Sequence, residues 1–166
     1  IYALRDVVDF VEEDSMLAVA TTSFDISVLD LLLPLCFGGE LIIADDNTVK
    51  NADALSMLLE ITQANLMQAT PATWEMLFES GWTNPTRTRL LSIGEPISTK
   101  LHRAFEANNC RIWNGYGPTE ATIYATAKDL VKGCQMSIGQ AIGNYKVYIL
   151  DKDQKPLPTG VPGELY

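Results

Sequence analysis

The chain has 166 residues, of which 12 are Lys or Arg and 21 are Asp or Glu, so its formal net charge is −9. The length is that of one ordinary domain, and the 47% content of hydrophobic residues matches folded globular proteins rather than disordered ones. The acidic balance, with no cluster of Lys or Arg, argues against a protein that binds the phosphate backbone of nucleic acids.

Helical and strand patterns alternate along the first 120 residues. Apolar residues at helical spacing, together with capping residues and glycine stops, predict helices at residues 1–11, 28–39, 51–63, 70–78 and 98–108. Short apolar runs predict buried strands at residues 16–22, 41–44, 66–69, 90–93 and 110–114. The Ser and Asp residues of segment 23–27 are expected to cap the helix that follows.

The pattern changes after residue 121, where helices give way to short β runs at residues 122–129 and 146–150 and to a Pro- and Gly-rich stretch. The prediction is an α/β fold with a parallel sheet flanked by helices over roughly residues 15–120, followed by a smaller antiparallel β region. Residues 1–125 would form the sheet portion and residues 126–166 the start of the β-rich portion. Because the chain opens and stops inside predicted elements, we expect it to be the central piece of a longer protein.

Three cysteines, Cys36, Cys110 and Cys134, are an odd number at wide spacing, which fits neither a disulfide framework nor a zinc site. We expect reduced, mostly buried thiols in a cytoplasmic protein. The longest apolar stretch, residues 28–37, includes an Asp and a Pro and is too short to cross a bilayer, so no membrane association is expected.

Ligands of open α/β sheets bind beyond the carboxyl ends of the strands. The loops expected there are residues 23–27, 69–73, 94–96 and 114–120. In the last loop, Gly115 and Gly117 allow the backbone to approach a ligand closely, and Tyr116 offers a face for stacking. Thr119 supplies a hydroxyl and Glu120 a carboxylate suited to Mg²⁺ beside a phosphate. On composition alone, a structural turn with an acid near a helix N-terminus is the simpler explanation.

Two further polar residues draw attention. Asp25 follows a buried strand among apolar neighbours, where a carboxylate needs a partner such as a ligand ammonium; a helix N-cap explains it equally well. The only histidine, His102, has no Ser, Cys or Asp pattern around it, so we expect a surface residue and not a catalytic base. The motifs of serine hydrolases, zinc proteases and P-loop proteins are absent.

Taken together and in order, these loops resemble the adenylate-forming (AMP-binding) enzymes, and specifically the amino-acid adenylation domains of nonribosomal peptide synthetases, which serve secondary metabolite biosynthesis. The motifs are FDIS at 24–27, QATPATW at 68–74, GEP at 94–96, NGYGPTEAT at 114–122, IGQAIG at 138–143 and GEL at 163–165. The resemblance implies a fragment of the large N-terminal subdomain of such an enzyme, covering residues 1–166.

This family is a class of ligases that activate a carboxylic acid with Mg-ATP as an acyl-adenylate and pass the acyl group to a phosphopantetheine thiol. The resemblance therefore implies ATP and Mg²⁺, an amino-acid substrate, and carrier-protein and condensation domains as partners in the parent chain. Asp25 would pair with the α-ammonium group of the amino acid. Asn114 would hydrogen-bond the adenine edge and Tyr116 would stack on the ring. Thr119 would contact phosphate and Glu120 would bind Mg²⁺. The backbones lining the pockets would be those of Gly94 and Gly117.

The resemblance also assigns residues to the pocket for the amino-acid side chain, namely Ile26, Leu29, Ala69, Leu91, Ile93, Gly115, Ile123 and Tyr124. None of them is Asp, Glu, Lys or Arg, so a neutral, small or aliphatic amino acid is expected. Ile93 is bulkier than the small residue usual in the family, and a shortened pocket favours glycine, alanine or a modest aliphatic residue.

Two other functions stay open. One is an acyl-CoA or aryl-acid ligase of the same superfamily, whose substrate would leave Asp25 without an ammonium partner. The other is a non-catalytic α/β binding module. The family's phosphate loop would precede residue 1, and its ribose-binding Asp and catalytic Lys would follow residue 166. The isolated 166-residue chain is therefore expected to be inactive.

Overall fold

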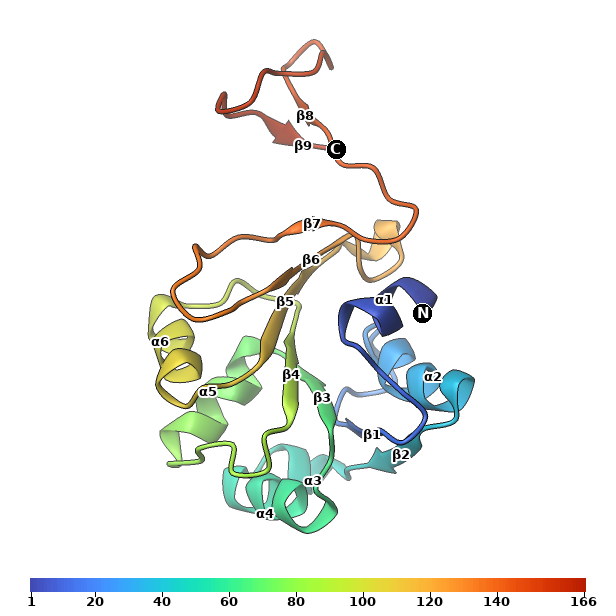
Figure 1. Cartoon of the computed structure of the whole chain (residues 1–166), viewed down its shortest axis with the longest axis vertical. Coiled ribbons are helices and arrows are strands. Elements are labelled where there is room, and N and C mark those ends of the chain that lie inside the picture. Colours follow the sequence, from blue (N-terminus) through green and yellow to red (C-terminus); the bar gives the residue numbers. More distant parts are fainter.

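A seven-stranded sheet in the order β2-β1-β3-β4-β5-β6-β7 forms the body of the protein in a computed structural model that describes all 166 residues (Figure 1). Its strands are β1 (Ser15–Ala18), β2 (Glu40–Ile43), β3 (Leu66–Ala69), β4 (Arg89–Ser92), β5 (Ile112–Tyr116), β6 (Thr126–Asp129) and β7 (Gln140–Ala141). The strands β1 to β5 are parallel, whereas β6 and β7 are antiparallel to their neighbours. The predicted parallel sheet with an antiparallel continuation is confirmed, and β6 and β7 extend the same sheet.

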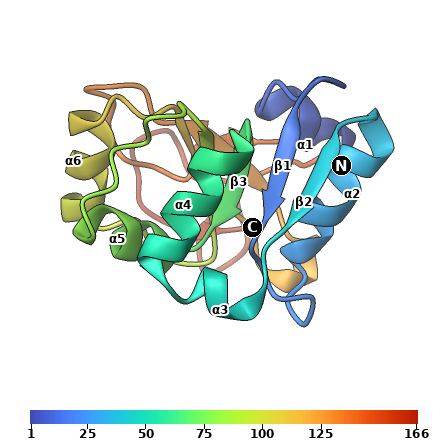
Figure 2. The same ribbon diagram turned by 90° about the horizontal axis from the view of Figure 1, so that it is seen from below.

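Helices cover both faces of this sheet (Figure 2). They are α1 (Tyr2–Val7), α2 (Ser27–Phe37), α3 (Asp46–Val49), α4 (Ala52–Thr62), α5 (Pro71–Glu79), α6 (Thr99–Ala107) and the 3₁₀-helix η1 (Thr119–Ala121). Side chains alternate across the strands, so Met16 and Leu66 pack in one core cluster with α1 and α2. Their neighbours Leu17 and Met67 pack in a second cluster with α4, α5 and α6. The sheet therefore separates two cores.

Several helix ends follow directly from local sequence. The side chains of Asn51 and Ser98 accept hydrogen bonds from the first turns of α4 and α6, and Gly38 ends α2 with a left-handed φ of 78°. The expected capping of α2 by segment 23–27 is wrong. Ile26 occupies that N-cap, and no side chain there accepts a hydrogen bond from the helix.

Other expectations need correction. The strand β2 lies at the sheet edge with exposed or half-buried side chains, so it is not a buried strand. The strand β5 continues through Tyr116, into the segment predicted as a loop. Cys36 is exposed, while the other two free cysteines are half-buried. His102 is half-buried rather than on the surface, and its Nε2 has no hydrogen-bond partner.

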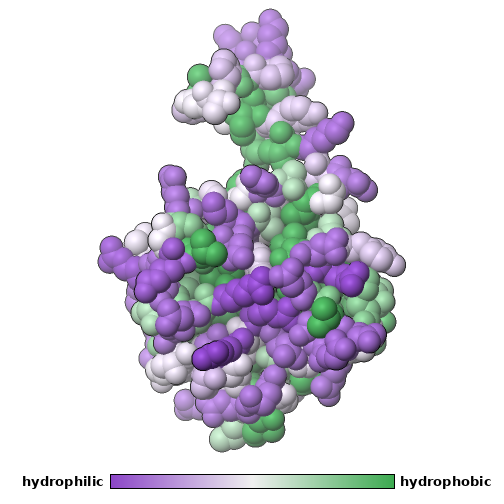
Figure 3. All heavy atoms as spheres, viewed as in Figure 1, coloured by the Kyte–Doolittle hydropathy of each residue, from purple (hydrophilic) through white to green (hydrophobic).

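A small hairpin of β8 (Ile149–Leu150) and β9 (Glu164–Leu165) stands apart from the main sheet in Figure 1. Only the last two residues of the β run predicted at 146–150 form a strand. Figure 3 shows hydrophobic residues gathered where the hairpin meets the body. Val147 and Leu165 line a small pocket together with Tyr116 and Ala125 of the body, and both are partly exposed. No helix has both the length and the apolar character needed to cross a membrane.

Candidate functional site

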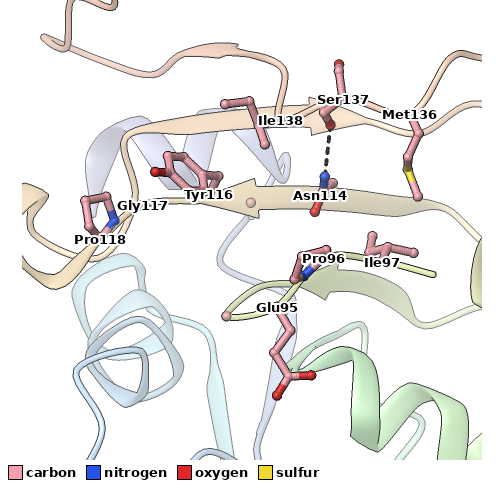
Figure 4. Close-up of a pocket in the computed structure, with 12 residues that line it drawn as sticks. Glu95, Pro96, Ile97, Asn114, Tyr116, Gly117, Pro118, Met136, Ser137 and Ile138 are labelled. Carbon is pink, nitrogen blue, oxygen red and sulfur yellow. Dashed lines mark hydrogen bonds between the residues drawn. The ribbon is translucent and has the colours of Figure 1, made fainter. Parts of the chain in front are cut away.

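A cavity of about 540 Å³ opens beyond the carboxyl ends of β4 and β5, and its size is typical of small-molecule sites (Figure 4). It is lined by Gly94, Glu95, Pro96, Ile97, Asn114, Gly115, Tyr116, Gly117, Pro118, Met136, Ser137 and Ile138. The loops at 94–96 and 114–120 thus meet as predicted. A third loop adjoins them, because a Cβ atom added at Gly94 would lie 3.7 Å from Cγ2 of Thr70. The loop at 23–27 does not line this cavity.

Two glycines shape the cavity wall for identifiable reasons. Gly94 turns the chain after β4 with a φ of 94°, which L side chains rarely adopt. Gly117 lies against the returning chain, where an added Cβ would collide with the carbonyl oxygen of Ile123 and stand 2.8 Å from the backbone nitrogen of Ala125. The close approach of these two segments therefore requires glycine at position 117.

Asn114 and Tyr116 present polar and aromatic groups to the cavity (Figure 4). The Nδ2 atom of Asn114 donates a 2.9 Å hydrogen bond to the carbonyl oxygen of Ser137, which ties β5 to the segment before β7. This bond uses one of the two N–H groups of the amide. Tyr116 is 39% exposed, so part of its ring is open to a ligand. The carboxylate of Glu95 points away from both residues in Figure 4.

Thr119 and Glu120 are exposed on η1, directly after Pro118 at the cavity rim. No group of three or more His, Cys, Asp or Glu side chains could hold a metal ion in this structure. The donor set therefore fits Mg²⁺ only in the manner common at nucleotide sites, with one or two carboxylates and the remaining positions filled by phosphate and water. Glu120, two residues after Pro118, is the carboxylate predicted for that role.

Asp25 is half-buried just before α2. Its side chain takes part in none of the hydrogen bonds or ion pairs of the structure, and it does not cap α2. The N-cap role considered for it is therefore wrong. A half-buried carboxylate without a protein partner is suited to pairing with a cationic group of a ligand.

Most residues assigned to the amino-acid pocket lie together in the core under α1 and α2. Leu29, Leu91, Ile93 and Tyr124 belong to that cluster, and Ile26 and Ile123 pack against it. The four cluster members are at most 2% exposed. Ala69 packs in the other cluster, on the opposite face of β3. Gly115 lies in β5, and its backbone also lines the large cavity.

Sequence reasoning missed two buried polar residues beside this pocket, Asp30 and Gln68. The Nε2 atom of Gln68 donates to Oδ1 of Asp30 at 2.7 Å and to the carbonyl oxygen of Ile26 at 2.8 Å. The hydroxyl of Tyr124 donates to Oε1 of Gln68. A signal was available, because a glutamine inside a buried strand and an aspartate inside the apolar run of α2 both need polar partners.

Burial controls the ionisation of Asp30 and Tyr124. Desolvation raises the pKa of Asp30 to about 7, although hydrogen bonds from the backbone N–H groups of Ala20 and Val19 and from Gln68 act in the opposite direction. Burial, and after it the nearby charge of Asp30, raises the pKa of Tyr124 well above its usual value. The Tyr124 hydroxyl therefore keeps its proton and remains a donor to Gln68.

Comparisons with known proteins add to this geometry. A family model described as AMP-binding enzyme matches residues 1–166. A dimodular nonribosomal peptide synthase of Bacillus subtilis (strain 168) is 39% identical over 166 residues, and a PKS-NRPS hybrid synthetase of Aspergillus candidus is 41% identical over 156 residues. These alignments cover 99% and 93% of this chain but only 7% and 6% of the relatives.

A solved structure is similar over the whole chain as well. It is the crystal structure of a four-domain nonribosomal peptide synthetase in its holo form, bound to AMP and glycine. The match has a TM-score of 0.93 and 34% sequence identity, and it covers 99% of this chain and 12% of that one.

Proposed function

Because the chain belongs to the AMP-binding enzyme family, we propose that its parent protein activates an amino acid with Mg-ATP as an aminoacyl-adenylate. The aminoacyl group is then transferred to the phosphopantetheine thiol of a carrier domain in nonribosomal peptide synthesis. The observation that carries this proposal is the cavity where the loops after β4 and β5 meet, with Asn114 and Tyr116 directed into it. The similarity to segments of two synthetases supports the same reading.

The nucleotide half of the site follows from the cavity. The ring of Tyr116 stacks on adenine, and the free N–H and the oxygen of the Asn114 amide hydrogen-bond its edge. Thr119 contacts a phosphate, and Glu120 binds Mg²⁺ on the rim beside it. Because Gly94 and Gly117 carry no side chain, the backbone can approach the nucleotide and the substrate closely.

The amino-acid half depends on Asp25, whose unpaired carboxylate pairs with the α-ammonium group. A ligase for simple acyl or aryl acids would leave this carboxylate without a cation, so the amino-acid substrate is favoured over that alternative. The apolar packing around Leu29 and Ile93 favours a neutral, small or aliphatic amino acid. The glycine bound in the matched synthetase structure agrees with that preference.

The formation of an acyl-adenylate makes chemical demands that such a site can meet. Attack of a carboxylate on the α-phosphorus of ATP needs in-line positioning and neutralisation of phosphate charge more than it needs proton transfer. Mg²⁺ supplies charge neutralisation when bound. The residues of this chain orient the two substrates, and the only histidine lies outside the cavity lining.

The partners and the setting are part of the same proposal. Carrier-protein and condensation domains would lie elsewhere in the parent chain, since the matched relatives are more than ten times longer than the aligned segment. The three free cysteines favour the cytoplasm. A non-catalytic α/β binding module is the remaining alternative, and it would bind no ATP.

The test is amino-acid-dependent ATP–pyrophosphate exchange by the intact parent adenylation domain, with Asp25→Ala as the variant. We expect exchange in the wild type and a loss of about 100-fold or more in Asp25→Ala, because a desolvated ammonium loses its partner. Asp46→Ala, on the exposed helix α3, is the matched control and is expected to keep full activity. Exchange that depends on a simple acyl or aryl acid and not on an amino acid, and that is unaffected by Asp25→Ala, would favour the acyl or aryl acid ligase. No exchange with ATP binding absent would favour the binding module.

A further inference from the structure

Residues 135–139 form a wall segment along one side of the cavity beyond β4 and β5. Three of them, Met136, Ser137 and Ile138, line the cavity. The wall segment has no regular secondary structure, and none of its residues takes part in a backbone–backbone hydrogen bond. Backbone polar groups need partners, so the position of this segment depends on bonds that side chains make to it.

Two side chains bind consecutive carbonyl groups of the wall segment. The Nδ2 atom of Asn114 donates a 2.9 Å hydrogen bond to the carbonyl oxygen of Ser137, as Figure 4 shows. The Oγ1 atom of Thr126 donates a 2.6 Å hydrogen bond to the carbonyl oxygen of Ile138. Asn114 belongs to β5 and Thr126 to the adjacent strand β6. Thr126 is 2% exposed and does not line the cavity, so it acts on a ligand only through the wall segment.

The Thr126 bond is the first attachment of the chain beyond the sheet ladder. The strand β7 pairs with β6 as far as Gln140, and the wall segment comes directly before that residue. Gly139 has a φ of 81°, and a Cβ atom added to it would collide with the carbonyl group of Ala127 on β6. Glycine therefore permits the close approach that brings the Ile138 carbonyl to the Thr126 hydroxyl.

The bond to Ser137 decides which way round the Asn114 amide faces the cavity. The two ends of an asparagine amide are alike in shape, but one donates hydrogen bonds and the other accepts them. Because Nδ2 is bound to Ser137, Oδ1 lies on the side away from the wall segment in Figure 4, free to accept from a ligand. The second N–H of Nδ2 stays free to donate.

This arrangement suits one purine base better than another. Adenine presents its amino group and N7 along one edge, and an asparagine amide binds both at once. Hypoxanthine carries a carbonyl oxygen in place of the amino group, so Oδ1 of Asn114 would face a second acceptor. Turning the amide over would suit hypoxanthine, but it would place Oδ1 against the carbonyl oxygen of Ser137. A wall segment held in place therefore opposes that reversal.

We infer that Thr126 is a positioning residue for nucleobase selectivity, holding the Ile138 carbonyl so that the Ser137 carbonyl orients Asn114 to accept ATP and reject inosine triphosphate. The inference rests on the proposed function and adds to it a residue outside the cavity lining. Without the Thr126 hydroxyl, the wall segment loses its attachment to β6, and the Asn114 amide loses the fixed acceptor that sets its orientation.

The experiment measures kcat/KM of the parent adenylation domain for ATP and for inosine triphosphate by amino-acid-dependent pyrophosphate exchange. We expect the wild type to favour ATP by at least about tenfold, as one bidentate contact to a base does. In Thr126→Val this ratio falls at least about threefold, chiefly through a higher KM for ATP, while the KM for the amino acid stays unchanged. Thr126→Ser keeps the hydroxyl and is expected to keep the ratio. A general loss of structure would lower both values of kcat/KM alike.

Thr88→Val is the matched control. Thr88 is 1% exposed, and its Oγ1 donates a 2.9 Å hydrogen bond to the carbonyl oxygen of Ala64, before the amino end of β4 and away from the cavity. This variant loses a buried bond of the same kind and should leave the ratio unchanged. Thr126→Ala repeats the deletion at position 126 without adding a methyl group, and it should lower the ratio as Thr126→Val does.

Three results would overturn the inference and leave the proposed function intact. They are a wild type that uses inosine triphosphate as well as ATP, a ratio unchanged in both Thr126→Val and Thr126→Ala, and a ratio that falls equally in Thr88→Val. Absence of exchange with either nucleotide in the wild type would overturn the proposed function and this inference together.

Discussion

The side-chain amide of Gln68 on β3 donates a 2.7 Å hydrogen bond to the carboxylate of Asp30 on α2, and both residues are fully buried. Strand and helix are thereby joined by a polar contact within an apolar core. Removing either partner lowers the stability of the protein, because the remaining group is then buried without a hydrogen-bond partner. Several measurable properties of the protein depend on this contact and on the residues around the cavity.

Asp30 gives the protein a pH-dependent stability. Its pKa is about 7 in the folded protein against 3.8 ordinarily, so between these values the folded state keeps a proton that the unfolded chain releases. The free energy of unfolding therefore falls as pH rises from about 4 to about 7, by at most about 1.4 kcal/mol per pH unit from this group. Asp30→Asn does not titrate, so the stability of the wild type relative to this variant should decline over that range. Urea unfolding of the parent domain at several pH values measures the difference, and a constant difference contradicts the assignment.

Tyr116 is expected to contribute to nucleotide affinity through stacking. Tyr116→Ala should raise the KM for ATP about two- to tenfold in pyrophosphate exchange, in keeping with the strength of an aromatic stacking contact. The KM for the amino acid should change much less. Tyr116→Phe keeps the ring and is the control expected to behave like the wild type, so an equal effect of both variants would argue against stacking.

Glu120 is expected to determine the Mg²⁺ requirement. Glu120→Gln removes the carboxylate charge at the cavity rim, so the Mg²⁺ concentration for half-maximal exchange should rise by about tenfold or more. Because Glu120 is exposed, the melting temperature should not change. Glu13→Gln, exposed and far along the chain, controls for the loss of one negative charge. An unchanged half-maximal Mg²⁺ concentration in Glu120→Gln would contradict the proposed role of Glu120 in binding Mg²⁺.

Leu33 and Leu35 lie on the same helix in opposite environments and give a matched stability test. Leu33 is fully buried under the sheet, whereas Leu35 is 65% exposed. Leu33→Ala should lower the free energy of unfolding by about 2–5 kcal/mol, and Leu35→Ala by less than about 0.5 kcal/mol. Thermal unfolding of the 166-residue chain compares them. Equal losses would mean that α2 does not pack as described.

The 166-residue chain alone should catalyse no measurable amino-acid-dependent pyrophosphate exchange. The family's phosphate loop, ribose-binding Asp and catalytic Lys are expected outside residues 1–166, and positioning of ATP needs them. The intact parent domain, assayed beside it at equal concentration, is the positive control. Exchange by the isolated chain near the rate of the parent would refute this expectation.

Much of the fold could be predicted because hydrophobic periodicity is local. The predicted strand at residues 66–69 and the predicted helix at residues 70–78 agree with β3 and α5 to within one residue. A short apolar run predicts a buried strand, and Thr70-Pro71 directly after it predicts the start of a helix. The capping of α2 could not be predicted, because Ser and Asp near a helix start fit a cap and an unpaired ligand-binding carboxylate equally well.

The sequence by itself determined which chemical groups are present at the carboxyl end of the sheet. The order of the motifs carries the family resemblance, and that resemblance implies a nucleotide site at positions 94, 114, 116 and 120; three of these positions line one cavity in the structure. Positions 114 and 116 lie at the end of β5, and positions 94 and 120 lie in the short segments that follow β4 and β5. Backbone freedom and side-chain type, which decide what these positions can contact, are properties of short segments.

Only the tertiary structure decided that Gln68, rather than Ala69, faces the pocket core, and that Asp30 and Tyr124 meet it there. The reason is physical. Successive residues of a strand point to opposite faces, so a difference of one residue decides which core receives a side chain. Which face of β3 a side chain occupies depends on the pairing of β3 with its neighbouring strands and on helices distant in sequence. It is therefore defined only when the whole sheet has formed.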